Sequence, residues 1–229
     1  MVRGAESKRN QGGLLMNENC WYVKVCKNRN CDNCVRYIEM KYLIDNSGIP
    51  AKRQYPQKLT PDIEDINAFY MLDDIKADIE QFVANGENLY ITGANTGNGK
   101  TSWAIRLLLK YFDCKWAGNG FNVRGIFTHT PTLLNTLKDF TEPRSHQKTV
   151  LESVDLVVWD DIASARLTDY DISQLLLLID QRELKGLANI YTGNITERDK
   201  LISMLGNRLA SRIWNKNTTV IELKGKDRR

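Results

Sequence analysis

A short glycine-rich stretch links an apolar segment to helix-forming residues, and it reads NLYITGANTGNGKT over residues 88–101. Gly97 and Gly99 allow backbone conformations that a side chain disfavours, so successive N–H groups can turn toward the phosphates of a nucleotide. Lys100 can then reach the β- and γ-phosphates, and the hydroxyl of Thr101 can bind Mg²⁺. The alternative is a hairpin turn, which has no use for Gly-Lys-Thr ahead of a long apolar helix. We therefore expect this loop to bind ATP and Mg²⁺.

The first glycine of the loop departs from the usual spacing. Ala94 stands five residues before Gly99, and Gly93 comes one residue earlier. Alanine is small enough to leave the interpretation intact. The expected nucleotide-binding residues of the loop are Gly93, Ala94, Asn95, Thr96, Gly97, Asn98, Gly99, Lys100, Thr101 and Ser102.

A second apolar run, residues 154–161, ends in two adjacent carboxylates, Asp160 and Asp161. A buried parallel strand brings such side chains to the carboxyl edge of its sheet, beside the phosphate loop. Asp160 can hold Mg²⁺ through water, and Asp161 can orient and deprotonate the water that attacks the γ-phosphate. The alternative is a strand that ends in a polar turn. Aspartate at 161 is one methylene shorter than glutamate, which predicts slow or partner-dependent hydrolysis.

Further polar residues fit the same chemistry. Asn194 ends a third apolar run, where its amide can hydrogen-bond the γ-phosphate or the attacking water, although Gly-Asn is also a favoured turn pair. Arg208 and Arg212 lie four residues apart and therefore on one face of a helix. That face is either solvated or able to reach the γ-phosphate of a neighbouring subunit. Within one chain, the sequence places only Lys100 as a cation near the γ-phosphate.

Four of the five cysteines fall within fifteen residues. They are Cys20, Cys26, Cys31 and Cys34, and Cys114 stands apart on a predicted helix. In a reducing compartment, clustered thiols favour metal binding over a disulfide. Cys31-x-x-Cys34 can hold one ion from a tight turn, and Cys20 and Cys26 can complete a tetrahedral zinc site. An iron–sulfur cluster and free structural cysteines are the alternatives.

Composition favours one α/β domain with a small appendage, because the chain has 229 residues, of which 42% are hydrophobic. No apolar run could span a bilayer and the N-terminus lacks a secretory signal, so we expect a cytoplasmic protein without a membrane partner. Residues 1–60 carry 11 Lys and Arg against 5 Asp and Glu, whereas residues 61–229 carry 21 against 23. This asymmetry suggests a front segment that meets nucleic acid or an acidic protein surface. The histidines, His129 and His146, are interpreted as ordinary residues.

The pattern along the chain predicts four parts. Residues 1–15 form a disordered tail, 16–45 a Cys-rich zinc module for partner contact, 46–61 a linker with three prolines, and 62–229 the ATPase domain. Thr60-Pro61-Asp62 predicts the start of a helix that continues to Phe82. Strands are expected at the apolar run that opens the stretch 88–101 and at residues 123–128, 154–159, 189–192 and 218–223, with helices such as 102–112 and 172–184 between them. This alternation predicts a five-stranded, parallel, doubly wound sheet.

The chain resembles the DnaC/DnaI family of AAA+ helicase loaders, including bacteriophage versions. The resemblance lies in the order and spacing of the phosphate loop, Asp160-Asp161, Thr192-Gly-Asn194, the two arginines and Gly225–Arg229. The resemblance covers residues 60–229 approximately. It implies a P-loop AAA+ core with Arg212 as the arginine finger and Arg208 as second choice. It also implies Arg229 as the sensor 2 residue, with Arg228 fitting less well. No room is expected after Leu223 for a helical lid. The cysteine cluster is similar to the N-terminal zinc modules by which such loaders contact the helicase.

The resemblance implies an ATP-dependent loader that forms an open or helical homo-oligomer, grips a hexameric DnaB-type replicative helicase and helps it onto single-stranded DNA. ATP binding would favour assembly, and hydrolysis to ADP and phosphate would favour release. The nearest alternative is an IstB-like ATPase that helps a transposase and binds duplex DNA. A P-loop small-molecule kinase would require an acceptor-binding lid that the sequence lacks. Asp161 and Asn194 argue against an adaptor that binds nucleotide only as a structural ligand.

Overall fold

The computed structural model describes residues 20–22, 26, 33–55, 58–138, 143–163 and 167–227. Its strands are β1 (Asn88–Thr92), β2 (Gly125–His129), β3 (Leu156–Asp160), β4 (Ala188–Gly193) and β5 (Thr218–Glu222). Its helices are α1 (Val35–Asp45), α2 (Ile66–Ala77), α3 (Ile79–Ala84), α4 (Lys100–Lys115), α5 (Thr130–Lys138), α6 (Pro143–Leu151), α7 (Asp169–Leu184) and α8 (Arg198–Ile213). Two 3-10 helices, η1 (Ala51–Arg53) and η2 (Ile63–Asp65), precede α2.

The five strands form one parallel sheet in the order β2-β3-β4-β1-β5. This confirms the five predicted parallel strands, and the ends of β2 to β5 differ from the predicted bounds by at most two residues. The start of β3 shows the reason for such a shift: the N–H of Val154 donates to the carbonyl of Val150, so Val154 still belongs to the turn after α6. The predicted strand residues before Leu156 are therefore not paired in the sheet.

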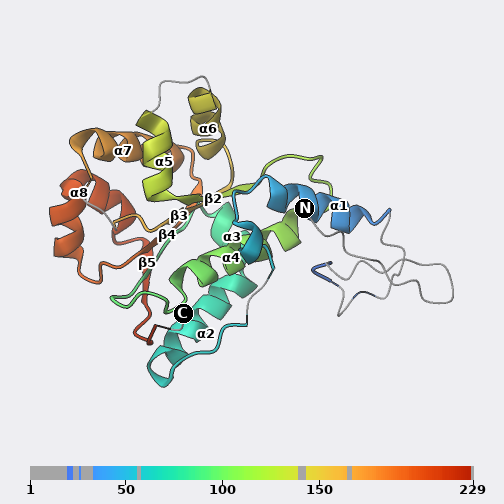
Figure 1. Ribbon diagram of the computed structural model, residues 1–229, viewed down its shortest axis with the longest axis horizontal. Coiled ribbons are helices and arrows are strands. Elements are labelled where there is room, and N and C mark those ends of the chain that lie inside the picture. The colour runs from blue at the N-terminus through green and yellow to red at the C-terminus, as the bar shows by residue number, and fades with distance from the viewer. Residues whose placement is uncertain are drawn as a thin grey trace, which may run out of the picture.

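Alternation along the strands gives the sheet two apolar faces. Leu89 and Ile91 of β1 belong to one buried cluster together with side chains of α1, α2, α3 and α4. Tyr90, between them in the chain, belongs to a second cluster that includes side chains of α5, α7 and α8. Figure 1 shows the two groups of helices on either side of the sheet. The site is therefore carried by a three-layer core in which strand ends meet at two opposite edges.

The first helix differs from the expected separate module. Met40, Leu43 and Ile44 of α1 are at most 2% exposed and share the cluster that contains the α4 side chains. Packing continues into the predicted linker, where Ile49 is buried and the N–H of Phe127 in β2 donates to the carbonyl of Ser47. Among the described residues of the segment 46–61, η1 is the only regular element. The boundaries of the four predicted parts stay a prediction. Side chains on both sides of the boundary between residues 45 and 46 belong to the same buried cluster.

The helix expected from Thr60 to Phe82 is broken in two places. Residues 63–65 form η2, and a second break at Asp78 separates α2 from α3. Asp65 does not cap α2, because its carboxylate accepts backbone N–H groups of Lys224 and Gly225 instead. The acidic residues that indicated a helix start thus hold a distant segment of the chain. Among the described helices, none is long and apolar enough to cross a membrane.

Candidate nucleotide-binding site

The phosphate loop lies between β1 and α4, as the motif predicts. Gly97 and Gly99 have φ angles of 69° and 106°, in the region that favours glycine. A Cβ on Gly93 would lie 2.1 Å from the carbonyl oxygen of Leu223, so no side chain fits there. Ala94, in contrast, is exposed. The displaced first glycine is therefore explained, because the close approach of Leu223, the residue after β5, falls on residue 93 and not on residue 94.

Lys100 points back into the hollow of this loop. Its Nζ donates to the carbonyl oxygens of Gly93 and Asn95, each at 2.8 Å, and to Oδ1 of Asn98 at 3.0 Å. The residue is 8% exposed, so the ammonium is largely removed from water. These neutral oxygens hold the positive charge where the phosphates of a nucleotide are expected. The geometry thus agrees with a phosphate-binding lysine.

Residues 223–227, which we call the C-terminal strap, hold the outer side of the loop. Asn98 Nδ2 donates to the carbonyl of Leu223 at 2.7 Å, and Asn95 Nδ2 donates to the carbonyls of Lys224 and Gly225 at 3.1 Å. From the other side, Asp65 accepts the N–H groups of Lys224 and Gly225. The strap therefore connects the loop with the start of α2, and Figure 1 shows this end of the chain beside α2.

The two carboxylates of β3 lie at the carboxyl edge of the sheet. Asp160 is 7% exposed, and its Oδ1 accepts a hydrogen bond from Oγ1 of Thr192 at 2.7 Å. The N–H of Asp161 donates to the same hydroxyl at 3.0 Å. Asp161 has a φ of 61°, a conformation that is uncommon for a residue with a side chain. Thr192, for which the sequence pattern predicted no role, thus holds the carboxylate of Asp160 and the backbone of Asp161 from the neighbouring strand.

A cleft of about 550 Å³ joins these parts. The predicted residues in its wall are Thr96, Gly97, Asn98, Gly99, Lys100, Thr101, Ser102, Asp161 and Asn194. Thr192 lines the cleft as well. Asp160, the last residue of β3, directly precedes Asp161 at the same edge of the sheet. Phosphate loop, carboxylate and amide therefore meet in one cavity, although they come from three separate parts of the sequence. The assignment of individual catalytic roles stays a prediction.

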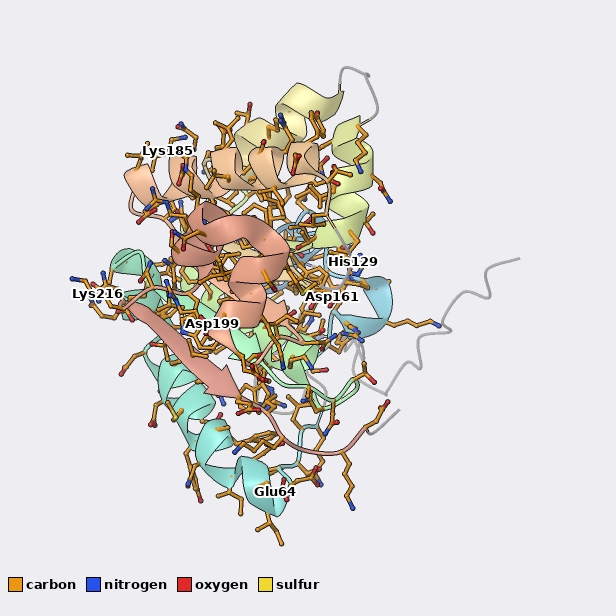
Figure 2. All side chains as sticks on the ribbon, turned by 90° about the vertical axis from the view of Figure 1, so that its left-hand side faces the viewer. Glu64, His129, Asp161, Lys185, Asp199 and Lys216 are labelled. Atoms are coloured by element: carbon orange, nitrogen blue, oxygen red, sulfur yellow. The ribbon has the colours of Figure 1, made fainter. Side chains whose placement is uncertain are left out.

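His129 also belongs to this edge, contrary to its interpretation as an ordinary residue. It ends β2, in register with Asp160, and its Nε2 lies 3.9 Å from Oδ2 of Asp161. Its Nδ1 contacts the hydroxyl of Thr132 at 2.9 Å. Figure 2 shows His129 and Asp161 next to each other. Strand order, which the sequence did not reveal, is what brings this imidazole to the carboxylate.

Two cations of the predicted linker line the same cleft. They are Arg53, the last residue of η1, and Lys58. The prediction that Lys100 is the only cation of the chain near the γ-phosphate stays a prediction, but Arg53 and Lys58 add two cations to the wall of the cleft. Sequence reasoning missed Arg53 and Lys58 because a proline-rich segment was treated as a spacer, whereas it folds back over the start of α4.

The two candidate arginine fingers lie on α8, away from the wall of the chain's own cleft. Gly206, with a φ of 75°, interrupts this helix, and both arginines follow the interruption. Arg212 is held by α7, since its Nε lies 2.6 Å from Oδ1 of Asp180 and 3.1 Å from Oε2 of Glu183. The hydrogen bond to Asp180 raises the pKa of Arg212. Arg208 is exposed, and its guanidinium forms no ion pair with any residue that the structure describes.

The predicted zinc site is only partly within the described residues. Cys20 and Cys34 are half-buried and Cys26 is exposed, but Cys31 lies outside them. Among the described residues, no group of three or more potential ligands could hold a metal ion. Arg228 and Arg229, the sensor 2 candidates, also lie outside the described part of the chain. Zinc binding and the sensor 2 role thus stay predictions.

No protein-family model matches the chain, and no curated protein matches it. Solved structures do match. The DnaC helicase loader is similar with a TM-score of 0.61 and 24% identity, over 72% of this chain and 93% of that one. DnaI gives a TM-score of 0.55 and 18% identity, over 84% of this chain and 93% of that one. AMPPCP-bound DnaA from Aquifex aeolicus gives 0.52 and 17%, over 82% of this chain and 52% of that one.

At these levels of identity the comparisons show the fold. The chain has the fold of DnaC/DnaI-type helicase loaders, and about half of the DnaA chain shares this fold. The sequence motifs resemble those of DnaC/DnaI-type loaders, and the fold is similar to that of DnaC and DnaI. Motifs and fold therefore agree.

Proposed function

We propose that the chain is an ATPase that loads a hexameric, DnaB-type replicative helicase onto single-stranded DNA in the cytoplasm. One observation carries the ATPase part: the phosphate loop, Asp161 and Asn194 line a single cleft. The similarity to a protein described as the DnaC helicase loader supports the loading part. The similarity to a DnaA that holds AMPPCP, an ATP analogue, supports the choice of nucleotide.

The oxygen-rich side chains at the cleft fit a magnesium ion. Asp160 keeps one carboxylate oxygen that is not engaged by Thr192, and the hydroxyl of Thr101 lies at the start of α4. Carboxylate, hydroxyl and phosphate oxygens are the ligands that Mg²⁺ prefers. Thr101 and Asp160 would hold the ion, which supplies positive charge to the β- and γ-phosphates.

The chain's own groups would then carry out hydrolysis. Lys100 exchanges its contacts with carbonyl oxygens for contacts with the phosphates. Asp161 accepts a proton from the attacking water, and Asn194 orients that water by a hydrogen bond. Burial of Asp160 and the two hydrogen bonds of Thr192 keep the carboxylate edge in place. Arg212, or Arg208 in second place, would supply charge to the γ-phosphate of a neighbouring subunit in a homo-oligomer.

The N-terminal cysteine segment is the proposed contact with the helicase, with zinc held by Cys20, Cys26, Cys31 and Cys34. The excess of positive charge in residues 1–60 supports a separate binding role for this part of the chain. Zinc would stabilise only the segment that contains its ligands.

Two measurements test the proposal. The chain, used as bait in a lysate of host or infected cells, should recover the replicative helicase. The purified pair should then place the helicase on single-stranded DNA when ATP is present, which unwinding of a forked substrate reports. Recovery of a transposase without helicase would contradict the proposal in favour of the IstB-like alternative, as would helicase that binds but is never loaded.

A further inference from the structure

The segment before the ATPase core contributes a charged wall to the nucleotide cleft. Arg53, at the end of η1, lines the cleft together with residues of the phosphate loop. Its side chain is exposed, and it has no hydrogen-bond or ion-pair partner among the residues that the structure describes. A guanidinium presents five N–H donors and is permanently charged, so it binds phosphate oxygens well. Arg53 is therefore a cation at an anion-binding cleft, with its donors available.

A second, smaller cavity indicates where along the nucleotide Arg53 acts. This cavity, of about 210 Å³, has Arg53 and Ser102 in common with the main cleft. It is otherwise lined by Lys52, Tyr55, Ile105, Arg106 and Leu109, so the described part of its wall contains no carboxylate. Asp161 and Asn194 are in the wall of the main cleft only. Arg53 thus lies on the Ser102 side of the cleft, at the start of α4, and not on the carboxylate side where the γ-phosphate is hydrolysed.

Contacts within the protein hold the backbone around Arg53. The N–H of Arg53 donates to the carbonyl of Pro50 at 2.7 Å. The next residue, Gln54, accepts a hydrogen bond at its carbonyl from the indole Nε1 of Trp21 at 2.9 Å. The same indole stacks on Tyr55, with ring centroids 5.6 Å apart and an interplanar angle of 16°. Little backbone freedom is lost when Arg53 engages a ligand, which favours binding.

We propose that Arg53 binds the nucleotide through the α- and β-phosphates, the part that ATP and ADP share. This inference rests on the nucleotide-binding function proposed above. It makes the segment before the core a part of the nucleotide site. Because the γ-phosphate is not involved, Arg53 contributes to affinity for the nucleoside di- and triphosphate and not to discrimination between them.

Equilibrium binding of ATP and of ADP to the full chain tests the inference, by titration calorimetry with Mg²⁺. Arg53→Ala should weaken both nucleotides by roughly tenfold, since a hydrogen bond to a charged group is typically worth more than one factor of ten. Arg53→Lys should keep part of the affinity, because it keeps the charge but loses the planar donors. Lys52→Ala is the matched control: the residue precedes Arg53 in η1 and lines only the smaller cavity.

The outcomes separate the inference from the function on which it rests. An affinity of the parent chain for ATP supports the function, and its absence overturns both. With binding established, equal loss for ATP and ADP in Arg53→Ala and a small effect in Lys52→Ala support the inference. It is overturned by unchanged affinities in Arg53→Ala, by a loss confined to ATP, or by an equal loss in Lys52→Ala. Thermal unfolding without nucleotide checks that each variant is folded.

Discussion

The two edges of the parallel sheet use polar groups in opposite ways. At the amino edge, Arg182 is fully buried, and its guanidinium donates to the carbonyls of Leu151, Val154 and Ala188 at 2.6 to 2.8 Å. At the carboxyl edge, Asp161 is partly exposed in a cleft and has a strained backbone. The first edge satisfies its polar groups within the protein, whereas the second leaves capacity for a ligand. We therefore expect the polar groups at the amino edge to stabilise the fold and those at the carboxyl edge to bind and hydrolyse the nucleotide.

At the amino edge, a buried charged side chain is held by several hydrogen bonds. Burial lowers the pKa of Arg182 to about 10. Its Nε donates to Oδ1 of Asn189, which also accepts from Nε1 of Trp159, and Asn189 in turn donates to Oδ1 of Asn88. One arginine thus connects α7 with β4, β3 and β1. At the carboxyl edge, by contrast, one hydroxyl of Thr192 holds the carboxylate of Asp160 and the N–H of Asp161.

The largest expected effect concerns charge supplied between subunits. Arg212→Ala should bind ATP normally and lose about 10³-fold or more in turnover, because an arginine finger stabilises the transition state. Losing its exposed ion pairs with Asp180 and Glu183 should cost little stability. Mixing Arg212→Ala with Asp161→Asn creates interfaces that pair an intact Asp161 with an intact Arg212, so steady-state ATPase activity should partly return.

Arg208→Ala is the matched control for that experiment, since it lies on the same part of α8 without the contacts to α7. If the two inactive variants assemble together and their mixture stays inactive, Arg212 does not act in trans. If Arg208→Ala loses turnover and regains it on mixing with Asp161→Asn, while Arg212→Ala does neither, the arginine finger is Arg208.

A substitution at the amino edge should affect stability alone. Arg182→Met keeps much of the side-chain volume but leaves several buried oxygens without a donor, each worth about 1–3 kcal/mol. We expect a loss of about 3–5 kcal/mol in the free energy of unfolding. Denaturant unfolding measures it, and Arg198→Met, at an exposed arginine with one carbonyl partner, should change it by about 0.5 kcal/mol at most.

ATP binding by the same variant tests whether the amino edge is purely structural. We expect folded Arg182→Met to bind ATP as the parent does. A variant with parent stability but a defective ATPase would show that this edge takes part in the chemistry.

A smaller effect is expected for Thr192→Val, which keeps the shape but removes the hydroxyl that bonds Asp160 and the N–H of Asp161. Turnover should fall roughly tenfold through loss of positioning, with little change in ATP affinity. Thr128→Val, at a buried threonine of β2, is the control. Equal rates for the parent and Thr192→Val in a steady-state assay would show that Thr192 does not position the carboxylates.

Metal removal should affect helicase capture more than the nucleotide site. The folded chain should contain about one zinc ion, and chelation should weaken helicase capture more than it weakens ATP binding. Elemental analysis and titration calorimetry measure the two quantities. Cys114→Ser should retain the metal, since Cys114 lies on α4 outside the cluster. Protein prepared under reducing conditions without chelators that contains no metal would end the zinc prediction.

Local patterns made much of this molecule predictable. Apolar runs between turn residues identified all five strands, and each motif placed its polar residue at the end of such a run. Gly97, Gly99 and Lys100 could be assigned because the loop is continuous in the sequence. The order of the motifs along the chain also indicated the fold.

Contacts between distant residues could not be predicted in this way. His129 reaches Asp161 only because β2 lies beside β3, and no local pattern determines that order. The C-terminal strap meets Asp65 across about 160 residues of chain. Arg53 looked like a linker residue since proline excludes regular structure but does not exclude packing. In each case, tertiary pairing added a residue to the site that spacing alone could not supply.

The most direct test of the account is the ATP turnover of Asp161→Asn, measured beside its ATP affinity. We expect a dissociation constant within about threefold of the parent and a turnover lower by about 10²–10⁴-fold, because the loop still binds the phosphates while the base is lost. Lys100→Ala, in contrast, should abolish binding. Hydrolysis by Asp161→Asn at the parent rate would contradict the claim that the carboxyl edge of the sheet carries out the chemistry.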